Sequence, residues 1–249
     1  MRWVLTMFVI AGLTTAAIRA DETKDAPSAG GEGAAVLEKA REAMKGLKSV
    51  RYKVDYRGTG WLVERVPTVS ATVLLAGQSQ WKIDRFHFEG TLQPPKTEQP
   101  VNVTAGCDGD LYFLVHNEKK TVYEDIDTAV LGSFGRSIPR AVLSGFTSGD
   151  PLADEGKAEK FELKEPQSVE GESCDQVLVT MSGDRQVIWY ISQKDHLPRR
   201  YDRLMKDPEK GSATTELVVS RLELNPKVEG NPFKAVVPEG FTKSDQFAP

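Results

Sequence analysis

One stretch of the chain combines residue types that could perform acid–base chemistry or bind an anion. Residues 189–201, with the sequence WYISQKDHLPRRY, place His196 beside Asp195 and close to the pair Arg199 and Arg200. A histidine next to a carboxylate could act as a general base, and two arginines could hold a phosphate or a carboxylate. The alternative is a hairpin whose tip is charged.

The pattern around this stretch favours the hairpin. Apolar residues alternate before it, which predicts a strand, and residues 193–196 have the composition of a turn. The return strand would begin at Pro198, a position where proline is tolerated. We therefore expect His196 to be exposed at the tip, and Arg199 and Arg200 to point to opposite faces of the sheet.

Other candidate catalytic and metal-binding residues are scattered along the chain. The motifs HExxH, CxxC, GxGxxG and GxSxG and the P-loop are absent. His87 and His116 lie far apart, so a metal site would have to be assembled from distant segments. Carboxylates such as Glu124 and Asp125 fall at expected turns and strand ends, where solvated charges are typical. The sequence favours a non-catalytic protein with no cofactor and no bound metal.

The apolar residues give a different indication. Aromatic side chains recur in predicted strands that only a few helices could cover. The alternatives are an ordinary filled core and an apolar cavity under an imperfect cover. The sheet residues expected at this surface are Tyr52, Val54, Tyr56, Trp61, Val73, Leu75, Trp81, Phe86, Phe88, Val103, Phe113 and Trp189.

The elements that position these residues begin with a helix in residues 34–49. Leu37, Ala40, Met44 and Leu47 recur at spacings of three and four, which predicts an amphipathic helix of about four turns.

Residues 127–147 predict two further short helices, the second starting near Ile138. Apolar residues again recur at spacings of three and four, while Gly132, Gly135 and Pro139 exclude one long helix. Glycine and proline would also lower the cost of moving these helices as a lid. The lid residues expected to face the sheet are Leu37, Met44, Leu131, Phe134, Ile138, Val142 and Phe146.

Strands account for most of the remaining chain. Strict alternation in residues 50–57 predicts a strand with one wet face, and Asp108-Gly109 predicts a hairpin turn. Residues 91–100 read as a loop. The proline-rich tail would be anchored by Phe233, Val236, Val237 and Phe241. About ten or eleven antiparallel strands form one large sheet, which has to curl, close or split; the class is α+β.

The sequence leaves open whether the two cysteines, Cys107 and Cys174, form a disulfide. An exported compartment permits a bond, but sequence spacing cannot show that the two residues meet. Because Cys107 continues the apolar alternation of the preceding strand, a buried free thiol is the alternative.

The amino terminus resembles a signal peptide. Arg2 precedes the apolar run of residues 3–13, which is short for a membrane span, and small residues follow up to Ala20. We expect cleavage after Ala20 or Ala17, with an uncleaved anchor as the alternative. The predicted organisation is a signal peptide (1–20), a flexible leader (21–33) and a single domain (34–249).

Composition restricts the partners. The 249-residue chain has a net charge of −4, and loss of two arginines with residues 1–20 would leave 30 basic against 36 acidic residues, or −6. This balance argues against nucleic-acid binding. No other segment is long and apolar enough for a stable membrane anchor after cleavage.

Several motifs together resemble the LolA/LolB-like superfamily of periplasmic proteins, in particular its predicted periplasmic and lipoprotein-sorting members. A first helix is followed by the strand pattern YxVxYxG. The later matches are V-x-G-x-x-C ending at Cys174, W-x-I at Trp189, L-P-R-R at residues 197–200 and V-P-x-G-F ending at Phe241. The resemblance covers most of residues 34–241, and its motifs are structural rather than catalytic.

The resemblance implies an unclosed β-barrel with a helical lid over an apolar cavity. It also implies a periplasmic, non-catalytic carrier for a lipid or a lipoprotein acyl chain. The carrier of this family uses a barrel arginine that hydrogen-bonds the lid; Arg51, Arg57 and Arg85 are all candidates here, and none is assigned. The alternative function is an envelope stress sensor or protein-interaction module with a filled core, binding envelope proteins.

Overall fold

The computed structural model describes residues 31–77, 85–97, 99–124, 138, 141–143, 146 and 151–245. Its elements in chain order are α1 (Glu32–Met44), β1 (Ser49–Gly58), η1 (Gly60–Leu62), β2 (Thr68–Ala76), β3 (Arg85–Gln93), β4 (Val101–Cys107), β5 (Tyr112–His116), β6 (Thr121–Glu124), η3 (Glu155–Lys157), β7 (Lys160–Val169), β8 (Glu172–Met181), η4 (Ser182–Asp184), β9 (Arg185–Ser192), β10 (Pro198–Asp207), β11 (Gly211–Leu224) and β12 (Thr242–Ser244).

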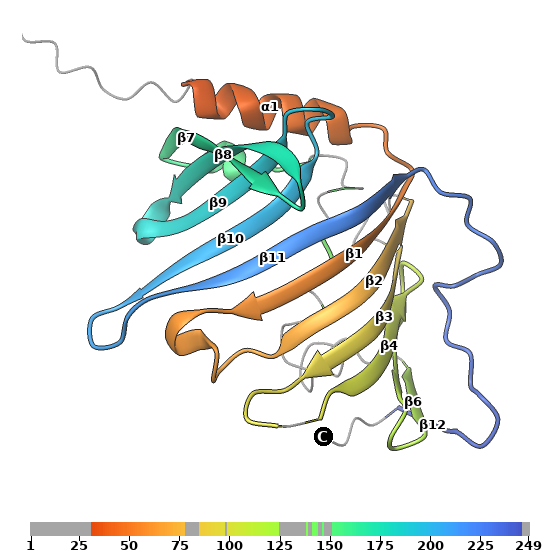
Figure 1. The fold of residues 1–249 in the computed structure, drawn as a ribbon. Helices are drawn as coiled ribbons and strands as arrows, with labels where there is room; N and C mark the ends of the chain where they lie inside the picture. Colours follow the sequence, from red (N-terminus) through yellow and green to blue (C-terminus); the bar gives the residue numbers. More distant parts are fainter. Residues whose placement is uncertain are drawn as a thin grey trace, which may run out of the picture.

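The twelve strands described form one sheet in the order β12-β6-β5-β4-β3-β2-β1-β11-β10-β9-β8-β7. Neighbouring strands pair antiparallel, except that β12 runs parallel to β6. The sheet bends strongly, and its edge strands β7 and β12 do not pair with each other (Figure 1). The expected α+β class and unclosed barrel are therefore confirmed, with one strand more than the sequence predicted.

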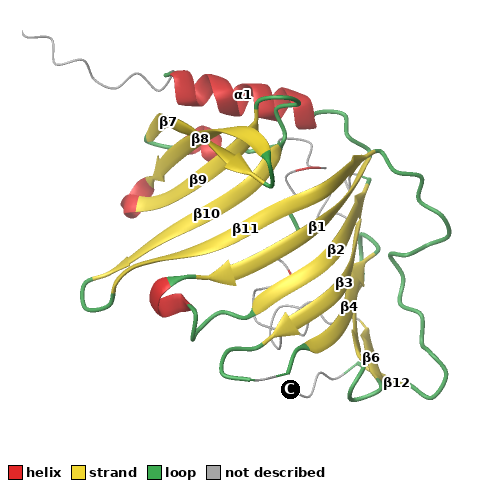
Figure 2. Ribbon diagram, in the orientation of Figure 1, coloured by secondary structure: helices red, strands yellow, loops and turns green. Residues whose placement is uncertain are grey.

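The helix α1 lies across the end of the sheet formed by β7, β8 and β9 (Figure 2). It buries Leu37 and Met44 in the main core. Gly33 allows this close approach, since a Cβ there would lie 3.2 Å from the backbone nitrogen of Leu163. The helix ends at Met44, five residues before the predicted end, because Gly46 takes the left-handed φ of +83° and turns the chain toward β1.

The inner, concave face of the sheet carries the main apolar core. In β1 the side chains of Val50, Tyr52, Val54 and Tyr56 are at most 3% exposed, as strict alternation predicts. The same cluster includes buried residues of α1 and the described residues of the mid-chain segment, Ile138, Ala141 and Phe146.

The outer face is partly covered by residues 225–241, which we call the C-terminal strap. Phe233 packs with Leu74 of β2, and Phe241 packs against a second small cluster on β5 and β6. These two contacts agree with the predicted anchors. Val236 and Val237 do not, because they are 73% and 44% exposed between the two contact points.

Three segments differ from the sequence-based expectation. The strand β3 continues through Gln93, inside a stretch predicted as loop, because residues 91–93 still pair with β2. Trp61 lies in the 3-10 turn η1 instead of a strand. The strand β12 follows the strap and was not predicted. No helix within the described residues has the length and apolar character needed to cross a membrane.

Candidate ligand-binding site

Most of the predicted sheet residues meet on the inner face. Each is at most 7% exposed and belongs to the main core cluster. These residues are Tyr52, Val54, Tyr56, Val73, Leu75, Phe86, Phe88, Val103 and Trp189. Alternation placed them correctly because they occupy strands in which successive side chains point to opposite faces.

Two predicted residues lie elsewhere. Phe113 points to the outer face, where it packs with Val115 and Val122, and its neighbour Leu114 faces the main core instead. The run from Leu111 to Val115 is apolar throughout, so periodicity alone could not select a face. Trp61 is half-buried in η1.

The indole of Trp61 is held outside the inner face by polar contacts. Its Nε1 donates to the carbonyl of Gly211 at 3.3 Å, and its ring lies 5.2 Å from the guanidinium carbon of Arg65 and 5.7 Å from the Nζ of Lys210. The glycine-rich sequence before it ends β1 at Gly58, so the strand alternation does not reach this residue.

The predicted lid residues that are described do lie over the sheet. Leu37, Met44, Ile138 and Phe146 are at most 5% exposed in the main cluster, and Val142 is partly buried against it. The remaining predicted site residues, Trp81, Leu131 and Phe134, fall outside the described residues, as does most of the segment 127–147.

Tyr52 joins the sheet to the lid. Its hydroxyl donates to the carbonyl of Ala141 at 3.1 Å and accepts from the backbone N–H of Leu143 at 2.8 Å. Its ring lies 5.6 Å from that of Phe146. Burial raises the pKa of Tyr52 above its ordinary value, so the phenol stays neutral and can serve as both donor and acceptor. The sequence identified Tyr52 as an apolar wall residue and gave no sign of this polar role.

The three arginines considered for a lid contact have other partners. Arg51 pairs with Glu223 at 2.8 Å and Arg57 with Glu216 at 2.6 Å, both from β1 to β11. The Nε of Arg85 donates to the carbonyl of Ala76. The hydrogen bonds from sheet to lid described above come from a tyrosine, Tyr52, and not from one of these arginines.

A second polar contact lies under α1. The Nε1 of Trp189 donates to a carboxylate oxygen of Glu155 in η3 at 3.2 Å, and the Trp189 ring lies 4.6 Å from that of Tyr201. A cavity of about 180 Å³ adjoins this point, between α1, η3 and Phe161 of β7. Burial raises the pKa of Glu155. The sequence gave no indication of Glu155, because carboxylates in its neighbourhood read as solvated turn residues.

The stretch at residues 189–201 is a hairpin, but its arginines differ from the prediction. Arg199 is 8% exposed and pairs with Glu172 at 2.8 Å and Asp195 at 2.6 Å. Arg200 pairs with Asp202 and Glu216. Both arginines therefore engage acidic partners within the protein.

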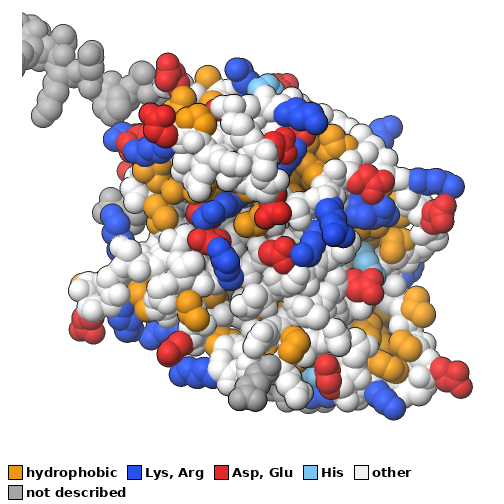
Figure 3. Space-filling model, viewed as in Figure 1, with side chains coloured by type: hydrophobic (Ala, Val, Ile, Leu, Met, Phe, Trp, Pro, Cys, Tyr) orange, Lys and Arg blue, Asp and Glu red, His pale blue; other side chains and the backbone are white. Residues whose placement is uncertain are grey.

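The prediction that these arginines point to opposite faces was wrong. A bulge between Pro198 and Arg200 interrupts the alternation. Arg199 pairs with Glu172, which lies two residues before Cys174 in β8 and so on the same face. Cys174 packs with Tyr190, and the Arg200 guanidinium lies 4.9 Å from the Tyr190 ring centroid. Both arginines therefore lie around one outer-face cluster. Figure 3 shows cations and carboxylates side by side on this face.

The three histidines lie in separate environments. The Nδ1 of His87 is 2.7 Å from the carbonyl of Pro232 in the strap, and the Nδ1 of His116 is 3.2 Å from Glu118. His196 is half-buried beside α1 rather than exposed, because a φ of +59° folds the turn back toward the helix. Within the described residues, no group of three His, Cys, Asp or Glu side chains could hold a metal ion.

Cys107 and Cys174 are both buried and free. Cys107 belongs to the main core, whereas Cys174 packs with Val169 and Tyr190 in a separate cluster. The buried free thiol considered from the sequence is thus the arrangement found. Burial raises the pKa of the Cys174 thiol to about 11, so it is protonated and unreactive at neutral pH.

No protein-family model and no curated protein matches the chain in sequence. Solved structures match it in fold. LprF from Mycobacterium bovis superposes with a TM-score of 0.52 at 14% identity, covering 82% of this chain and 98% of LprF. Lipoprotein LppX from Mycobacterium tuberculosis gives a TM-score of 0.47 at 20% identity, covering 78% and 96%. A LolA superfamily protein from Nitrosomonas europaea gives 0.35 at 13% identity, covering 82% and 97%.

At 14% identity, the superposition on LprF leaves ligands and partners undetermined. The match to LprF shows a shared fold, and the unclosed, strongly curved sheet with its helical cover has the architecture that the sequence resemblance implied.

Proposed function

We propose that this chain is an exported, non-catalytic carrier in the periplasm. Its ligand would be an apolar molecule, such as a lipid or the acyl chain of a lipoprotein, bound between the lid and the inner face of the sheet. Envelope proteins would be its partners in loading and release. The observation that best supports this proposal is the contact made by Tyr52, a buried side chain of the sheet that holds the backbone of the lid through two neutral hydrogen bonds.

The contact at Tyr52 suits a lid that opens reversibly. Two neutral hydrogen bonds contribute together about 1–3 kcal/mol to the closed state. Such a contact fixes the position of the lid without the larger cost of separating a buried ion pair.

The apolar surface under the lid determines whether opening is favourable with and without a ligand. Exposing Ile138 and Phe146 to water would cost about 1.5–3 kcal/mol for each side chain. An acyl chain that replaces them on the inner face recovers about 0.8 kcal/mol for each buried CH₂. Opening without a ligand is therefore unfavourable, whereas exchange of lid side chains for an acyl chain is nearly balanced. Transfer would then follow the relative affinities of successive partners, with no chemical step.

Native mass spectrometry of the protein purified from membranes tests this proposal. We expect a fraction of the chain to carry a lipid mass that a fluorescent fatty acid displaces. If no lipid co-purifies and no fluorescent fatty acid binds, the carrier proposal is wrong. A closed, filled interior would then support the alternative of an interaction module.

A matched pair of variants tests the role of the lid contact. Tyr52→Phe keeps the ring against Phe146 but removes both hydrogen bonds to the lid, so uptake of a neutral fluorescent apolar probe should become faster. Tyr190→Phe removes a hydrogen bond on the outer face, from the hydroxyl to Asp202, and should leave uptake unchanged. If the two variants change the rate of uptake equally, the hydrogen bonds of Tyr52 do not hold the lid on the sheet.

A further inference from the structure

A groove of about 790 Å³ opens at the end of the sheet where β1 begins, β2 ends and β3 begins. The first part of the C-terminal strap forms its other wall, and we call it the rim groove. Its apolar lining includes Leu47, which belongs to the main core, and Phe233 and Val228, which pack on the outer face. The groove therefore lies at the border between the two faces, and its size is ordinary for a small-molecule site.

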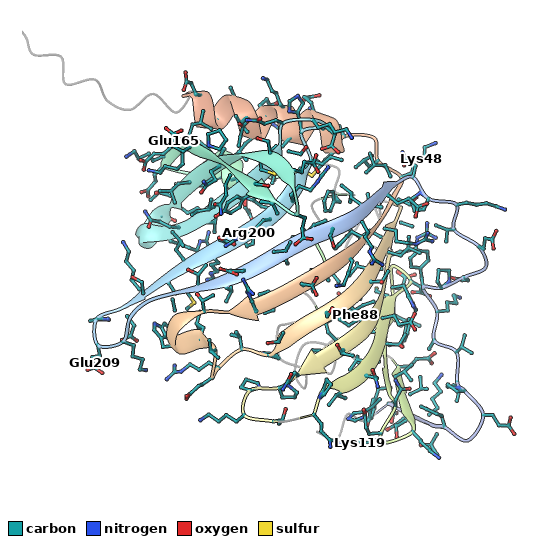
Figure 4. All side chains as sticks on the ribbon, in the orientation of Figure 1. Lys48, Phe88, Lys119, Glu165, Arg200 and Glu209 are labelled. Carbon is teal, nitrogen blue, oxygen red and sulfur yellow. The ribbon has the colours of Figure 1, made fainter. Side chains whose placement is uncertain are left out.

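Among the described residues, the charged side chains lining the rim groove are Lys48 and Arg85, both cations. Neither forms an ion pair with another described residue. The carboxylate of Asp108, on the hairpin beside Arg85, pairs with Lys234 and accepts from the backbone N–H of Leu111. The described lining of the groove is thus electropositive in a chain whose net charge is −4. Figure 4 shows Lys48 at this end of the sheet.

The guanidinium of Arg85 is held in position before any ligand arrives. Its Nε donates to the carbonyl of Ala76 at 3.2 Å, and its Cζ lies 5.2 Å from the ring centroid of Phe233. At Gly77, whose φ is +70°, a Cβ would lie 2.6 Å from a terminal nitrogen of Arg85. Glycine at this position allows the guanidinium to lie against the backbone. Its terminal nitrogens make no hydrogen bond to a described residue, so they can donate to an anion.

The walls of the rim groove are joined by hydrogen bonds. The side-chain oxygen of Asn225 accepts from the backbone N–H of Lys48 at 2.8 Å, and the N–H of Asn225 donates to the carbonyl of Ser49 at 2.8 Å. The N–H of Gly77 donates to the carbonyl of Lys48 at 2.7 Å. The strap, β1 and β2 are therefore fixed to one another, and ligand binding would not have to order them.

We propose that the rim groove binds an oxyanion carried on an apolar group, with Arg85 and Lys48 holding the phosphate or carboxylate and Leu47 and Val228 contacting the apolar part. Such a ligand is the head of an anionic amphiphile, either as a free molecule or in a lipid surface. The inference does not depend on the carrier proposal, because none of the lining residues of the groove belongs to the described part of the lid.

Isothermal titration calorimetry with hexyl phosphate tests the site, with hexanol and inorganic phosphate as comparison ligands. We expect hexyl phosphate to bind more tightly than either. Arg85→Gln should weaken it about tenfold, which corresponds to one charge-assisted hydrogen bond. Lys48→Gln, at an exposed side chain, should weaken it by a smaller factor. The control is Lys119→Gln, which removes a cation at the opposite end of the sheet (Figure 4) and should change nothing.

Flotation with phosphatidylglycerol vesicles separates the two sources of the anion. Binding to vesicles that is lost in both Lys48→Gln and Arg85→Gln, without binding of hexyl phosphate, would assign the site to a lipid surface. If hexyl phosphate and vesicles both fail to bind, or bind the variants as well as the parent chain, the proposal is overturned. If inorganic phosphate binds as tightly as hexyl phosphate, the proposed contact with an apolar group is wrong. Uptake of the neutral probe into the interior should be unchanged in both variants. A negative result at the rim groove would therefore not contradict the carrier proposal.

Discussion

The inner and outer faces of the sheet are built from alternate residues of the same strands, yet they are held together by different interactions. The inner face is apolar and is covered by α1 and by the described lid residues 138, 141–143 and 146. Its described polar contacts to the covering elements are the hydrogen bonds of Tyr52 to the lid and of Trp189 to Glu155. The outer face carries a connected ion-pair network and the C-terminal strap.

The ion pairs of the outer network extend across the neighbouring strands β1, β11 and β10, and a hydrogen bond from Tyr190 adds β9. Arg200 binds both oxygens of Asp202 at 2.7 Å and one oxygen of Glu216 at 3.0 Å, while Arg57 binds Glu216 from β1. Tyr190 donates to Asp202 at 3.1 Å. These contacts fix the strands to one another without any cover. The comparison indicates that the outer face fixes the strands to one another, and the proposed exchange of lid for ligand would take place on the inner face.

The largest effect is expected when a fully buried leucine of the inner face is truncated, compared with an exposed leucine at the edge of the sheet. Leu75→Ala, at a fully buried inner-face residue, should lower the free energy of unfolding by about 2–5 kcal/mol because it leaves a cavity. Leu163→Ala, at a residue that is 39% exposed on the edge strand β7, should stay within about 0.5 kcal/mol. Urea unfolding of both variants measures this, and equal losses would show that the inner face is not the main core.

Removing an arginine from the outer network should give the next largest effect. Arg200→Ala leaves the carboxylate of Asp202, which is 3% exposed, without its cation, and we expect a loss of about 2–3 kcal/mol at neutral pH. The control Arg51→Ala breaks a solvent-exposed pair with Glu223 and should cost less than about 1 kcal/mol. If the two variants unfold at the same urea concentration, the network adds nothing beyond its separate surface pairs.

A smaller effect should distinguish the two tyrosines. Tyr52→Phe and Tyr190→Phe should each destabilise the chain by about 1–2 kcal/mol, since each removes a buried hydroxyl from its partners. Their local effects should differ. Tyr52→Phe should speed hydrogen exchange at the amide of Leu143, which donates to the hydroxyl, and Tyr190→Phe should not. Unchanged protection at Leu143 in Tyr52→Phe would show that the lid is held by other contacts.

The smallest expected effect depends on pH. Burial raises the pKa of Glu155, so the folded chain binds more protons than the unfolded chain between the ordinary pKa of glutamate and the raised one. Stability therefore falls as pH rises through this window. Glu155→Gln keeps an acceptor for Trp189 and cannot ionise, so it should be slightly more stable than the parent chain at neutral pH. Thermal unfolding at several pH values should show this gain disappear in acid; a constant gain would exclude ionisation as its cause.

Several features of the fold and site could be predicted from local patterns. Strict alternation in β1 placed Tyr52, Val54 and Tyr56 on one buried face, and Asp108-Gly109 predicted the hairpin between β4 and β5. Spacings of three and four identified α1. Each of these patterns is confined to one element, so the amino-acid sequence contains it completely.

Other features depended on residues distant in the sequence. A single bulge at Pro198 to Arg200 reversed the expected side of Arg199, and nothing local distinguishes a bulge from a regular strand. Phe113 faces outward because the strap supplies apolar partners there, more than 120 residues later in the chain. The rim groove likewise joins Lys48, Arg85 and Phe233 from three separate segments.

The sequence by itself determined the class of fold and which strand faces are apolar, because hydrophobic periodicity is a local property of the chain. Only the tertiary structure decided what each buried polar group contacts. Tyr52 occupies a position where an apolar residue would give the same pattern, and its hydroxyl found partners at Ala141 and Leu143 only when the lid was placed over the sheet. Hydrogen bonds require an exact distance and direction between two groups, and for groups about ninety residues apart these are set by the folded chain as a whole.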